Sequence, residues 1–360
     1  METALSAPPA ASPCPPLLQW LALLLCSALV GGLLSWLQMP AALFLGPMLT
    51  AIAFGVGGAS IRVPRRLFQS GQGVVGCLIA HAMTAAVLLT VAEHWPVMLL
   101  ATALTVLLSL LTGALLVRFG GLPGSTAAWG TTPGAAAAMV AMAEEYGADP
   151  RIVATMQYVR VVCVVVISAL VGRLLGAEGS GTGHQATVVS LDGHFAFNLL
   201  LTLAVALAGS WLGGRLFSAG ALLVPIALGT VLQLNGWLDI TLPHALLALA
   251  YGAMGCYVGL RFDRATVRYV WRALPKMIVA SLLLIVLCAL SALLMAKLMH
   301  VDFLTAYLAT SPGGLDSMAI IAVDAHADVG LVLAMQALRL IGVVLTGPLL
   351  ARQLVKLART

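Results

Sequence analysis

The chain has 360 residues, of which 61% are hydrophobic and only 9% are charged, and its mean hydropathy is +1.05. A soluble globular domain carries roughly 25% charged residues, so this composition excludes an ordinary soluble fold. The net charge of +5 does not indicate nucleic-acid binding, because the basic residues flank apolar spans and form no patch interleaved with aromatic side chains. We expect no nucleic-acid partner.

Apolar runs long enough to cross the ~30 Å hydrocarbon layer recur along the whole chain. The runs are continuous rather than alternating with period two, which excludes an outer-membrane barrel. The sequence therefore predicts an all-α integral membrane protein whose partner is the lipid bilayer. The expected spans are 17–37, 41–59, 67–92, 96–117 and 151–175 in the first half, and 195–216, 219–236, 244–260, 276–296 and 329–350 in the second.

The first half of the sequence is repeated in the second half at a shift of 179 residues, and the register holds without a gap. The block TTPGAAAAM, which begins at Thr131, is answered by TSPGGLDSM, which begins at Thr310. A repeat of this length is a duplicated half-protein, as found in many membrane transporters. The matching pairs include Pro64 and Pro243, Cys77 and Cys256, Asp149 and Asp328, Gln157 and Gln336, and Arg160 and Arg339.

An unusual segment separates the fourth and fifth expected spans of each half, at 124–147 and 303–326. Each segment carries Pro-Gly near its middle, at Pro133-Gly134 and Pro312-Gly313. Proline removes a backbone donor and glycine loosens the chain, so these segments are predicted to be broken or re-entrant rather than straight helices.

Loop charges indicate that the two halves are inverted, because cytoplasmic loops collect Lys and Arg. A basic cluster follows the second span of the first half, at 62–66, but the corresponding loop of the second half, 235–244, has none. A basic cluster follows the third span of the second half, at 261–276, and again the corresponding loop has none. Five crossings per half would invert the halves and place both clusters inside, whereas six would make them parallel.

The expected organisation is a flexible N-terminal tail at 1–16, a membrane repeat at 17–176, a polar linker at 177–194, a second repeat at 195–352 and a basic tail at 353–360. The N-terminal region lacks the positive residues of a cleaved signal peptide, so we expect the first span to be retained. Both termini are predicted to lie in the cytoplasm of a bacterial inner (plasma) membrane protein.

The Pro-Gly segments are the first candidates for a substrate site. Broken backbone inside a bilayer is tolerated only where protein or water satisfies it, and in transporters such breaks line the site. The alternative is a plain kink, since Pro and Gly are common in membrane helices. The candidate residues are Thr131, Thr132, Pro133, Gly134, Thr310, Ser311, Pro312, Gly313 and Gly314.

Arg160 and Arg339 are the second candidates, because each lies about ten residues into a fifth span. An arginine at that depth costs at least ~2.5 kcal/mol and usually faces a cavity or a partner. Gln157 and Gln336 lie three residues earlier, on the same helix face. The alternative is structural: each arginine ties down the carbonyl groups of a broken helix.

Asp316 differs from its repeat mate, which is Ala137. An acid in an apolar segment must pair with a polar group or bind something, so Asp316 either has a structural partner or couples transport to a proton or cation. A second acidic group, Asp324-Ala-His326-Ala-Asp328, looks like a metal triplet, but residues two apart do not converge on one helix face. Asp328 and its mate Asp149 suit a helix N-cap. We predict no metal, no catalytic residues and no cofactor.

The paired blocks TTPGAAAAMVAMAEEYGADP…MQYVR and TSPGGLDSMAIIAVDAHADV…MQALR resemble those of the bacterial AbrB family of membrane proteins, over residues 17–352. That family shares only a name with DNA-binding AbrB regulators. Its members carry an ammonia monooxygenase label or are described as regulators of gene expression. The resemblance implies inverted repeats with broken helices, like those of antiporters and anion transporters.

We therefore expect a secondary transporter or exporter of a small solute. The two intramembrane arginines favour an anion as that solute. An ion gradient would drive it, because the sequence has no ATP-binding motif. One alternative is a membrane protein that changes gene expression indirectly through a solute level. The monooxygenase label is disfavoured, because such an enzyme needs several ligands converging on one metal. A homo-oligomer is left open.

Overall fold

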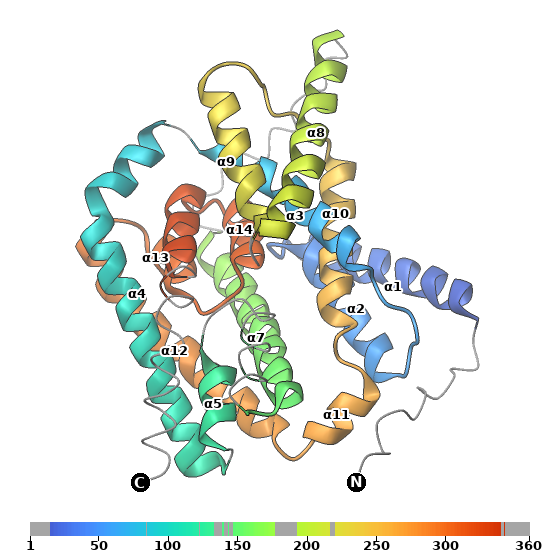
Figure 1. Cartoon of the computed structure of the whole chain (residues 1–360), viewed down its shortest axis with the longest axis vertical. Helices are drawn as coiled ribbons and strands as arrows, with labels where there is room; N and C mark the ends of the chain where they lie inside the picture. The colour runs from blue at the N-terminus through green and yellow to red at the C-terminus, as the bar shows by residue number, and fades with distance from the viewer. Residues whose placement is uncertain are drawn as a thin grey trace.

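The computed structural model describes residues 15–83, 85–121, 123–132, 139, 143, 147–176, 193–216, 220–339 and 342. All regular elements within these ranges are α-helices (Figure 1). In the first half they are α1 (Pro16–Trp36), α2 (Ala42–Val56), α3 (Arg65–Ala82), α4 (Ala85–Gly120), α5 (Gly124–Thr131) and α7 (Pro150–Gly176). In the second half they are α8 (Gly193–Leu216), α9 (Gly220–Leu234), α10 (His244–Gly259), α11 (Arg264–Val270), α12 (Leu274–Met299), α13 (Phe303–Thr310), α14 (Leu315–Asp324) and a last helix, Val329–Arg339.

Five of these helices are long and apolar enough to cross a membrane, and a sixth crossing forms if α10 and α11, bent by 49°, are one broken span. Ten spans were expected. The helices α2 and α9 have only 15 residues each, which is about 22 Å at 1.5 Å per residue and less than the ~30 Å hydrocarbon thickness. The apolar runs 41–59 and 219–236 are therefore longer than the helices they form.

One expected boundary is wrong. The sequence placed a span at 67–92 and the next at 96–117, but α3 ends at Ala82 and α4 continues from Ala85 through Pro96. Proline is tolerated inside membrane helices where neighbouring groups satisfy the freed carbonyl, so Pro96 does not mark a loop. The spans expected at 151–175 and 244–260 agree closely with α7 and α10.

The helices form two groups; α1, α2, α8 and α10 of the first lie on the right of Figure 1, and α4, α12 and α13 of the second lie on the left. The first group contains α1, α2, α3, α8, α9 and α10, and the second contains α4, α5, α7, α12, α13 and α14. In the first group α2 packs on α1 and α10, while its repeat mate α9 packs on α8 and α3. In the second group α4 packs on α5, and α12 packs on α13. These pairs are unchanged when the two halves of the sequence are exchanged, but α3 also packs on α8, whereas α10 has no comparable contact with α1.

Helices approach each other closely beside Cys77 and Cys256, two cysteines that occupy equivalent positions in the repeat. A Cβ atom on Gly76 would meet the backbone of Leu222 in α9, and one on Gly255 would meet the backbone of Phe44 in α2. The neighbouring Cys77 and Cys256 are buried free thiols. Small residues allow such close approach of helices in membranes, so these repeat mates lie at sites of close helix packing.

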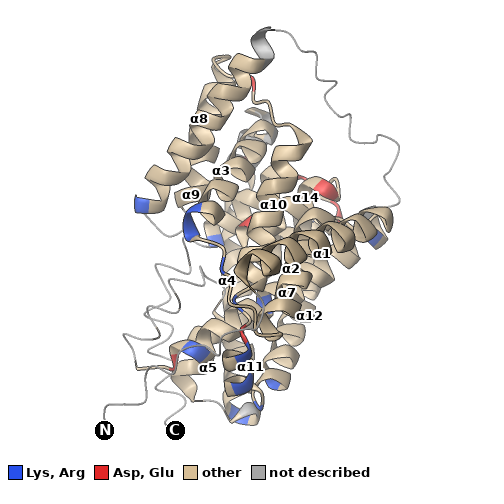
Figure 2. Cartoon of the chain, turned by 90° about the vertical axis from the view of Figure 1, so that its right-hand side faces the viewer, with Lys and Arg blue, Asp and Glu red and all other residues tan. Residues whose placement is uncertain are grey.

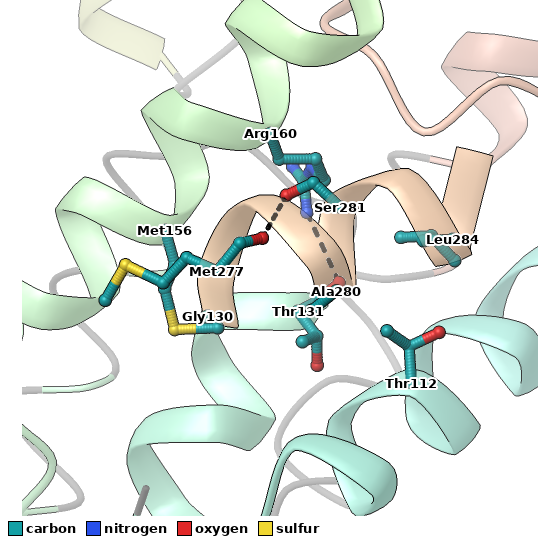
Figure 3. A pocket seen from close by; sticks show the side chains of 9 residues that line it. All are labelled: Thr112, Gly130, Thr131, Met156, Arg160, Met277, Ala280, Ser281 and Leu284. Atoms are coloured by element: carbon teal, nitrogen blue, oxygen red, sulfur yellow. Dashed lines mark hydrogen bonds between the residues drawn. The ribbon is translucent and has the colours of Figure 1, made fainter. Parts of the chain in front are cut away.

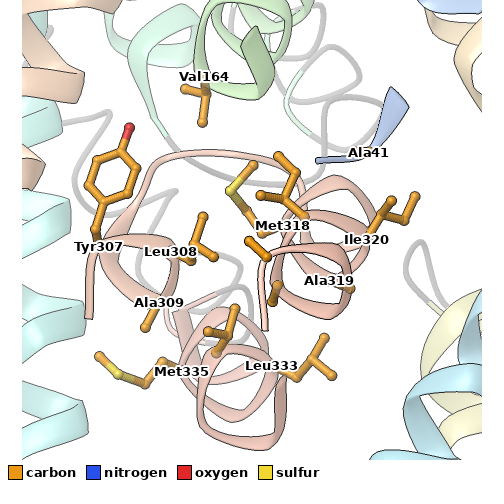
Figure 4. Packing of buried hydrophobic residues seen from close by; sticks show 14 of the residues in the cluster. Ala41, Val164, Tyr307, Leu308, Ala309, Met318, Ala319, Ile320, Leu333 and Met335 are labelled. Carbon is orange, nitrogen blue, oxygen red and sulfur yellow. The ribbon is translucent and has the colours of Figure 1, made fainter. Parts of the chain in front are cut away.

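The main hydrophobic core surrounds the broken segment of the second half. Leu308 of α13 lies next to Met318 of α14 in Figure 4, and both side chains are buried, as are those of Ala309 and Ile320. Ser311, Pro312 and Gly313 of the break are buried, so most of its non-helical backbone is covered by protein, which is the condition under which such backbone is tolerated in a membrane.

Exposed apolar side chains cover the outside of the molecule. Leu17 and Trp36 of α1, Leu200 of α8 and Leu249 of α10 are more than two thirds exposed. Figure 2 shows α1, α2 and α10 without charged residues, whereas Lys and Arg gather along α11. A soluble monomer rarely exposes so much contiguous apolar surface, and these features fit a membrane protein.

Candidate functional site

The second-half Pro-Gly segment is a helix break, as the sequence predicted. Helix α13 ends at Thr310 and α14 begins at Leu315, so residues 311–314, including Pro312 and Gly313, are not helical. Thr310 and Ser311 are almost completely buried. In the first half α5 ends at Thr131, and Thr132 follows in extended conformation. Pro133 and Gly134 lie outside the described residues.

The two glutamines bind the ends of the broken helices in the same way. Gln157 Nε2 donates to the carbonyl oxygens of Trp129 at 2.8 Å and Thr132 at 3.0 Å. Gln336 Nε2 donates to those of Leu308 at 2.8 Å and Ser311 at 3.1 Å. The accepting residues are themselves repeat mates, so duplication has preserved the whole contact.

Arg160 binds the carbonyl end of α5. Its Nη1 donates to the carbonyl oxygens of Thr131 at 3.3 Å and Thr132 at 3.0 Å, and its Nη2 donates to Gln157 Oε1 at 2.7 Å. The last carbonyls of a helix lack partners and carry partial negative charge. The cation therefore caps α5, which is the structural role considered for it.

Arg339 binds the break after α13 in a related but different way. Its Nη1 donates to the carbonyl oxygen of Ser311, and its Nη2 donates to that of Gly313 at 2.8 Å. Arg339 does not bind its neighbour Gln336, because Gln336 Oε1 is buried without a described hydrogen bond. The same holds for the Nε atoms of both arginines. Among the described residues, Gln336 therefore keeps an acceptor that its repeat mate Gln157 uses.

The two arginines lie within electrostatic range of each other, and Cys288 lies close to both. Arg160 is 4% and Arg339 is 6% exposed. Neither forms an ion pair with a described residue, whereas Arg62 and Asp263 form one at the surface. Two buried like charges without an acid are costly unless an anion or polar groups compensate them.

Asp316 joins the two helix groups. It lies in the first turn of α14, and its Oδ2 accepts a hydrogen bond of 2.7 Å from Gln72 Nε2 of α3. The structure therefore gives Asp316 a glutamine partner rather than an arginine. Sequence reasoning missed Gln72, although a glutamine within an expected apolar span, matched by Tyr251 in the repeat, was an available signal.

A small cavity opens beside Arg160 (Figure 3). Its lining includes Thr131 of α5, Arg160 of α7, Ser281 of α12 and Thr112 of α4. Its space of about 10 Å³ holds roughly one water molecule. Ser281 Oγ donates to the Met277 carbonyl, and Thr112 Oγ1 donates to that of Leu108. The hydroxyl oxygens keep acceptor capacity, so this cavity accommodates a polar group close to the arginine.

The broken helices approach opposite ends of α7. Asp149, which precedes α7, donates its backbone N–H to Thr126 Oγ1 near the start of α5. At the other end, a Cβ atom on Gly172 would contact Ala325, just after α14. Between them, Ser168 of α7 and Tyr307 of α13 share a hydrogen bond of 3.4 Å. Helix α5 therefore accompanies the first part of α7, whereas α13 and α14 accompany the second.

Asp149 and Asp328 are helix N-caps, as predicted. Asp149 Oδ1 accepts from the backbone of Ile152, and Asp328 Oδ1 accepts from that of Leu331. Asp324 has a different role, since its Oδ2 accepts from the backbone N–H of Ala41. The described residues contain no group of three His, Cys, Asp or Glu side chains that could hold a metal ion.

Comparison with known proteins gives matches over most of the chain. The family model described as "Transition state regulatory protein AbrB" matches residues 44–355. A protein of Escherichia coli (strain K12) named "Putative regulator AbrB" is 44% identical over 94% of this chain and 97% of its own length. The "Uncharacterized protein YhjN" of Bacillus subtilis (strain 168) is 27% identical over 78% of this chain and 77% of its own. No solved structure matches.

Proposed function

Because the chain belongs to the AbrB family, and its helices fit a membrane protein, we propose that it is a secondary transporter or exporter of a small anionic solute. The observation that carries the proposal is the pair of buried arginines, Arg160 and Arg339, each bound to a broken helix and neither paired with a described acid. An anion between the two guanidinium groups would compensate their charge. The unused Nε atoms provide further donors for it.

We propose further that the two halves have opposite orientations in the membrane. The contacts at the two ends of α7 support this, because α5 begins beside the start of α7 and α14 ends beside its end. Two broken helices that enter from opposite sides and meet near the middle are the arrangement in which inverted-repeat transporters hold their substrates. Arg62, Asp149 and Tyr269 then share the cytoplasmic side, since Arg62 binds the Leu260 carbonyl and Tyr269 binds Asp149.

Transport by alternating access requires the two helix groups to move relative to each other. The hydrogen bond between Gln72 and Asp316 crosses from one group to the other, so such movement would break and reform it. An acid at that position is suited to binding a proton or cation in one arrangement and glutamine in the other. Asp316 is accordingly the proposed coupling residue.

The test is flux through the purified protein in liposomes. Untargeted mass spectrometry of a deletion strain selects the carboxylates and phosphate esters that accumulate, and these are loaded into the vesicles as probes. Efflux should occur with wild-type protein and fall by about 10-fold or more in Arg339→Gln, the loss expected for a charge-assisted contact. Arg173→Gln, which changes an exposed arginine at the end of the same helix as Arg160, should retain efflux. Anion flux equal to that of empty liposomes would overturn the proposal.

The second candidate function is regulation of gene expression, which the regulator name of the Escherichia coli relative favours. A transporter can act in this way by changing the level of an internal solute. The two functions separate in one experiment: a flux-defective Arg339→Gln protein that still restores normal transcription in the deletion strain would support regulation without transport.

Topology is tested separately by a reporter enzyme that is active only in the periplasm. Fused after Thr360 it should be inactive, and inserted in the loop at Asp239 it should be active, because the proposal places these positions on opposite sides. The same activity at both positions would contradict the inverted arrangement.

A further inference from the structure

A second cavity lies at the start of α7, and neither Arg160 nor Arg339 is part of its lining. Its volume is about 290 Å³, and it lies between the first turns of α7 and the bend that joins α10 to α11. Ligand sites usually start at about 300 Å³, so this cavity is large enough for a headgroup. Its lining is Pro150, Arg151, Ala154, Thr155, Tyr158, Arg261, Phe262 and Thr266.

Two arginines of this cavity are held in place by aromatic rings. The guanidinium carbon of Arg261 lies 4.5 Å from the ring centroid of Tyr257 and 6.0 Å from that of Tyr158, and Arg261 donates to the Tyr257 hydroxyl. The guanidinium carbon of Arg151 lies 5.8 Å from the ring centroid of Tyr269. Stacking of this kind fixes an arginine without neutralising it.

The two described acids near the cavity, Asp149 and Asp263, are already engaged elsewhere. Asp149 accepts from the backbone of Arg151 and from the Tyr269 hydroxyl. Asp263 accepts from the backbone of Thr266 and from Arg62. Neither carboxylate is within ion-pair distance of Arg151 or Arg261. The cavity therefore keeps two positive charges and an adjacent hydroxyl side chain, Thr266.

The rest of the lining is apolar, because Pro150, Ala154 and Phe262 form part of its wall. A positive cavity with an apolar wall, at the end of membrane-length helices, fits a ligand that has both a phosphate and an acyl chain. We propose that this cavity binds the phosphate of an anionic phospholipid. Arg151 and Arg261 bind the phosphate oxygens, and the apolar wall contacts the glycerol and the first acyl carbons.

The bound lipid has a structural consequence, because the cavity joins the two helix groups. Arg151 comes from α7 of the second group, and Arg261 follows α10 of the first. A phosphate that contacts both side chains links the groups at the bend between α10 and α11. The lipid would thus set how easily the groups move apart, whether or not the protein transports a solute.

The experiment measures lipid binding to the delipidated full-length protein in neutral detergent. Phosphatidylglycerol, phosphatidylcholine and inorganic phosphate are titrated separately, at about 0.5 M salt to screen long-range attraction, and binding is followed by native mass spectrometry and thermal unfolding. Phosphatidylglycerol should bind and raise the unfolding temperature. The double variant Arg151→Gln/Arg261→Gln should bind it roughly 30-fold more weakly, as expected for the loss of two charges.

The matched control is Arg264→Gln/Arg268→Gln, which removes two charges from α11 without touching the cavity lining. It should bind phosphatidylglycerol within about 3-fold of wild type under screened conditions. Equal losses in the two double variants would overturn the proposal in favour of unspecific charge attraction. Equal binding of phosphatidylcholine, or stabilisation by inorganic phosphate alone, would overturn it in favour of a different ligand. Titration of wild-type protein decides these last outcomes even if a variant fails to fold.

Discussion

The broken helices of the two halves share a design but differ in how completely their polar groups are used. In the first half Gln157 uses both ends of its amide, binding two carbonyls and Arg160. In the second half Gln336 binds the two corresponding carbonyls, but its Oε1 has no described partner. Arg339 instead extends to the carbonyl oxygen of Gly313. Among the described residues, Gln157 thus uses both its donor and its acceptor, whereas Gln336 keeps an unused acceptor.

The halves also differ in charge. Asp316 in the second half replaces Ala137 of the first, and it reaches across to Gln72 in the other helix group. The contacts from the two glutamines to the broken helices are therefore the same in both halves, whereas the charge at position 316 differs from that of its repeat mate. Structural contacts tolerate little change, because leaving a buried carbonyl unpaired costs about 1–3 kcal/mol.

The largest expected effect comes from Asp316→Asn. Asparagine keeps an oxygen that can accept from Gln72 but removes the charge, so the protein should insert normally and lose any response of flux to an imposed proton or cation gradient. The measurement is solute flux in liposomes with and without the gradient. Asp239→Asn, in the loop before α10, is the control. A gradient response that survives in Asp316→Asn would make this acid merely structural.

Arg160→Met and Arg339→Met test whether the two arginines contribute differently to stability and to solute flux. Both leave carbonyls unpaired and should lower the free energy of unfolding by about 3–4 kcal/mol, with the greater loss for Arg160, which makes three described hydrogen bonds. Relative to the stability that each variant loses, Arg339→Met should reduce solute flux more than Arg160→Met does. Denaturant unfolding of purified protein, compared with flux, checks this. Identical behaviour of the two variants would remove the functional distinction between the halves.

Gln157→Leu and Gln336→Leu sharpen the same comparison. Each variant loses two hydrogen bonds to carbonyls, but Gln157→Leu also loses the bond from Arg160. It should therefore be less stable than Gln336→Leu by about 1.5 kcal/mol, a typical contribution for a bond to a charged group. Unfolding in denaturant measures the difference. A greater loss in Gln336→Leu would mean that its Oε1 has a partner in solution.

The smallest effects are expected at the helix caps. Asp149→Ala and Asp328→Ala should each cost about 1 kcal/mol. Asp149 also accepts from the Tyr269 hydroxyl, so its loss should exceed that of Asp328 by about 0.5–1 kcal/mol. In a Tyr269→Phe background the excess should disappear. If Asp149→Ala is still more destabilising than Asp328→Ala in that background, the excess comes from some other contact.

Much of the architecture could be predicted from the residues. The apolar runs predicted α1, α7, α8 and α12 closely, and the Pro-Gly pair predicted the interruption between α13 and α14. The repeat predicted that Gln157 and Gln336 have equivalent roles, and their contacts are equivalent. The end of α3 at Ala82 could not be predicted, because hydropathy is continuous across it and Pro96 lies inside α4.

The partners of the candidate residues were less predictable. Gln72 and Asp316 are far apart in the sequence, and no local pattern joins them. The acid was recognised because a carboxylate in an apolar segment needs a partner, but burial alone does not identify which one. Similarly, the cavity at Arg151 and Arg261 depends on two segments that only tertiary packing brings together.

The sequence alone determined the helical class, the duplication and the helix break between α13 and α14, because each follows from composition, the repeated register or the chemistry of Pro-Gly. Only the tertiary structure decided that the arginines bind carbonyl ends, that Asp316 bridges two helix groups, and that α5 and α13 accompany different parts of α7. The physical reason is that hydrogen bonds are short and directional, so which groups meet depends on how distant helices pack.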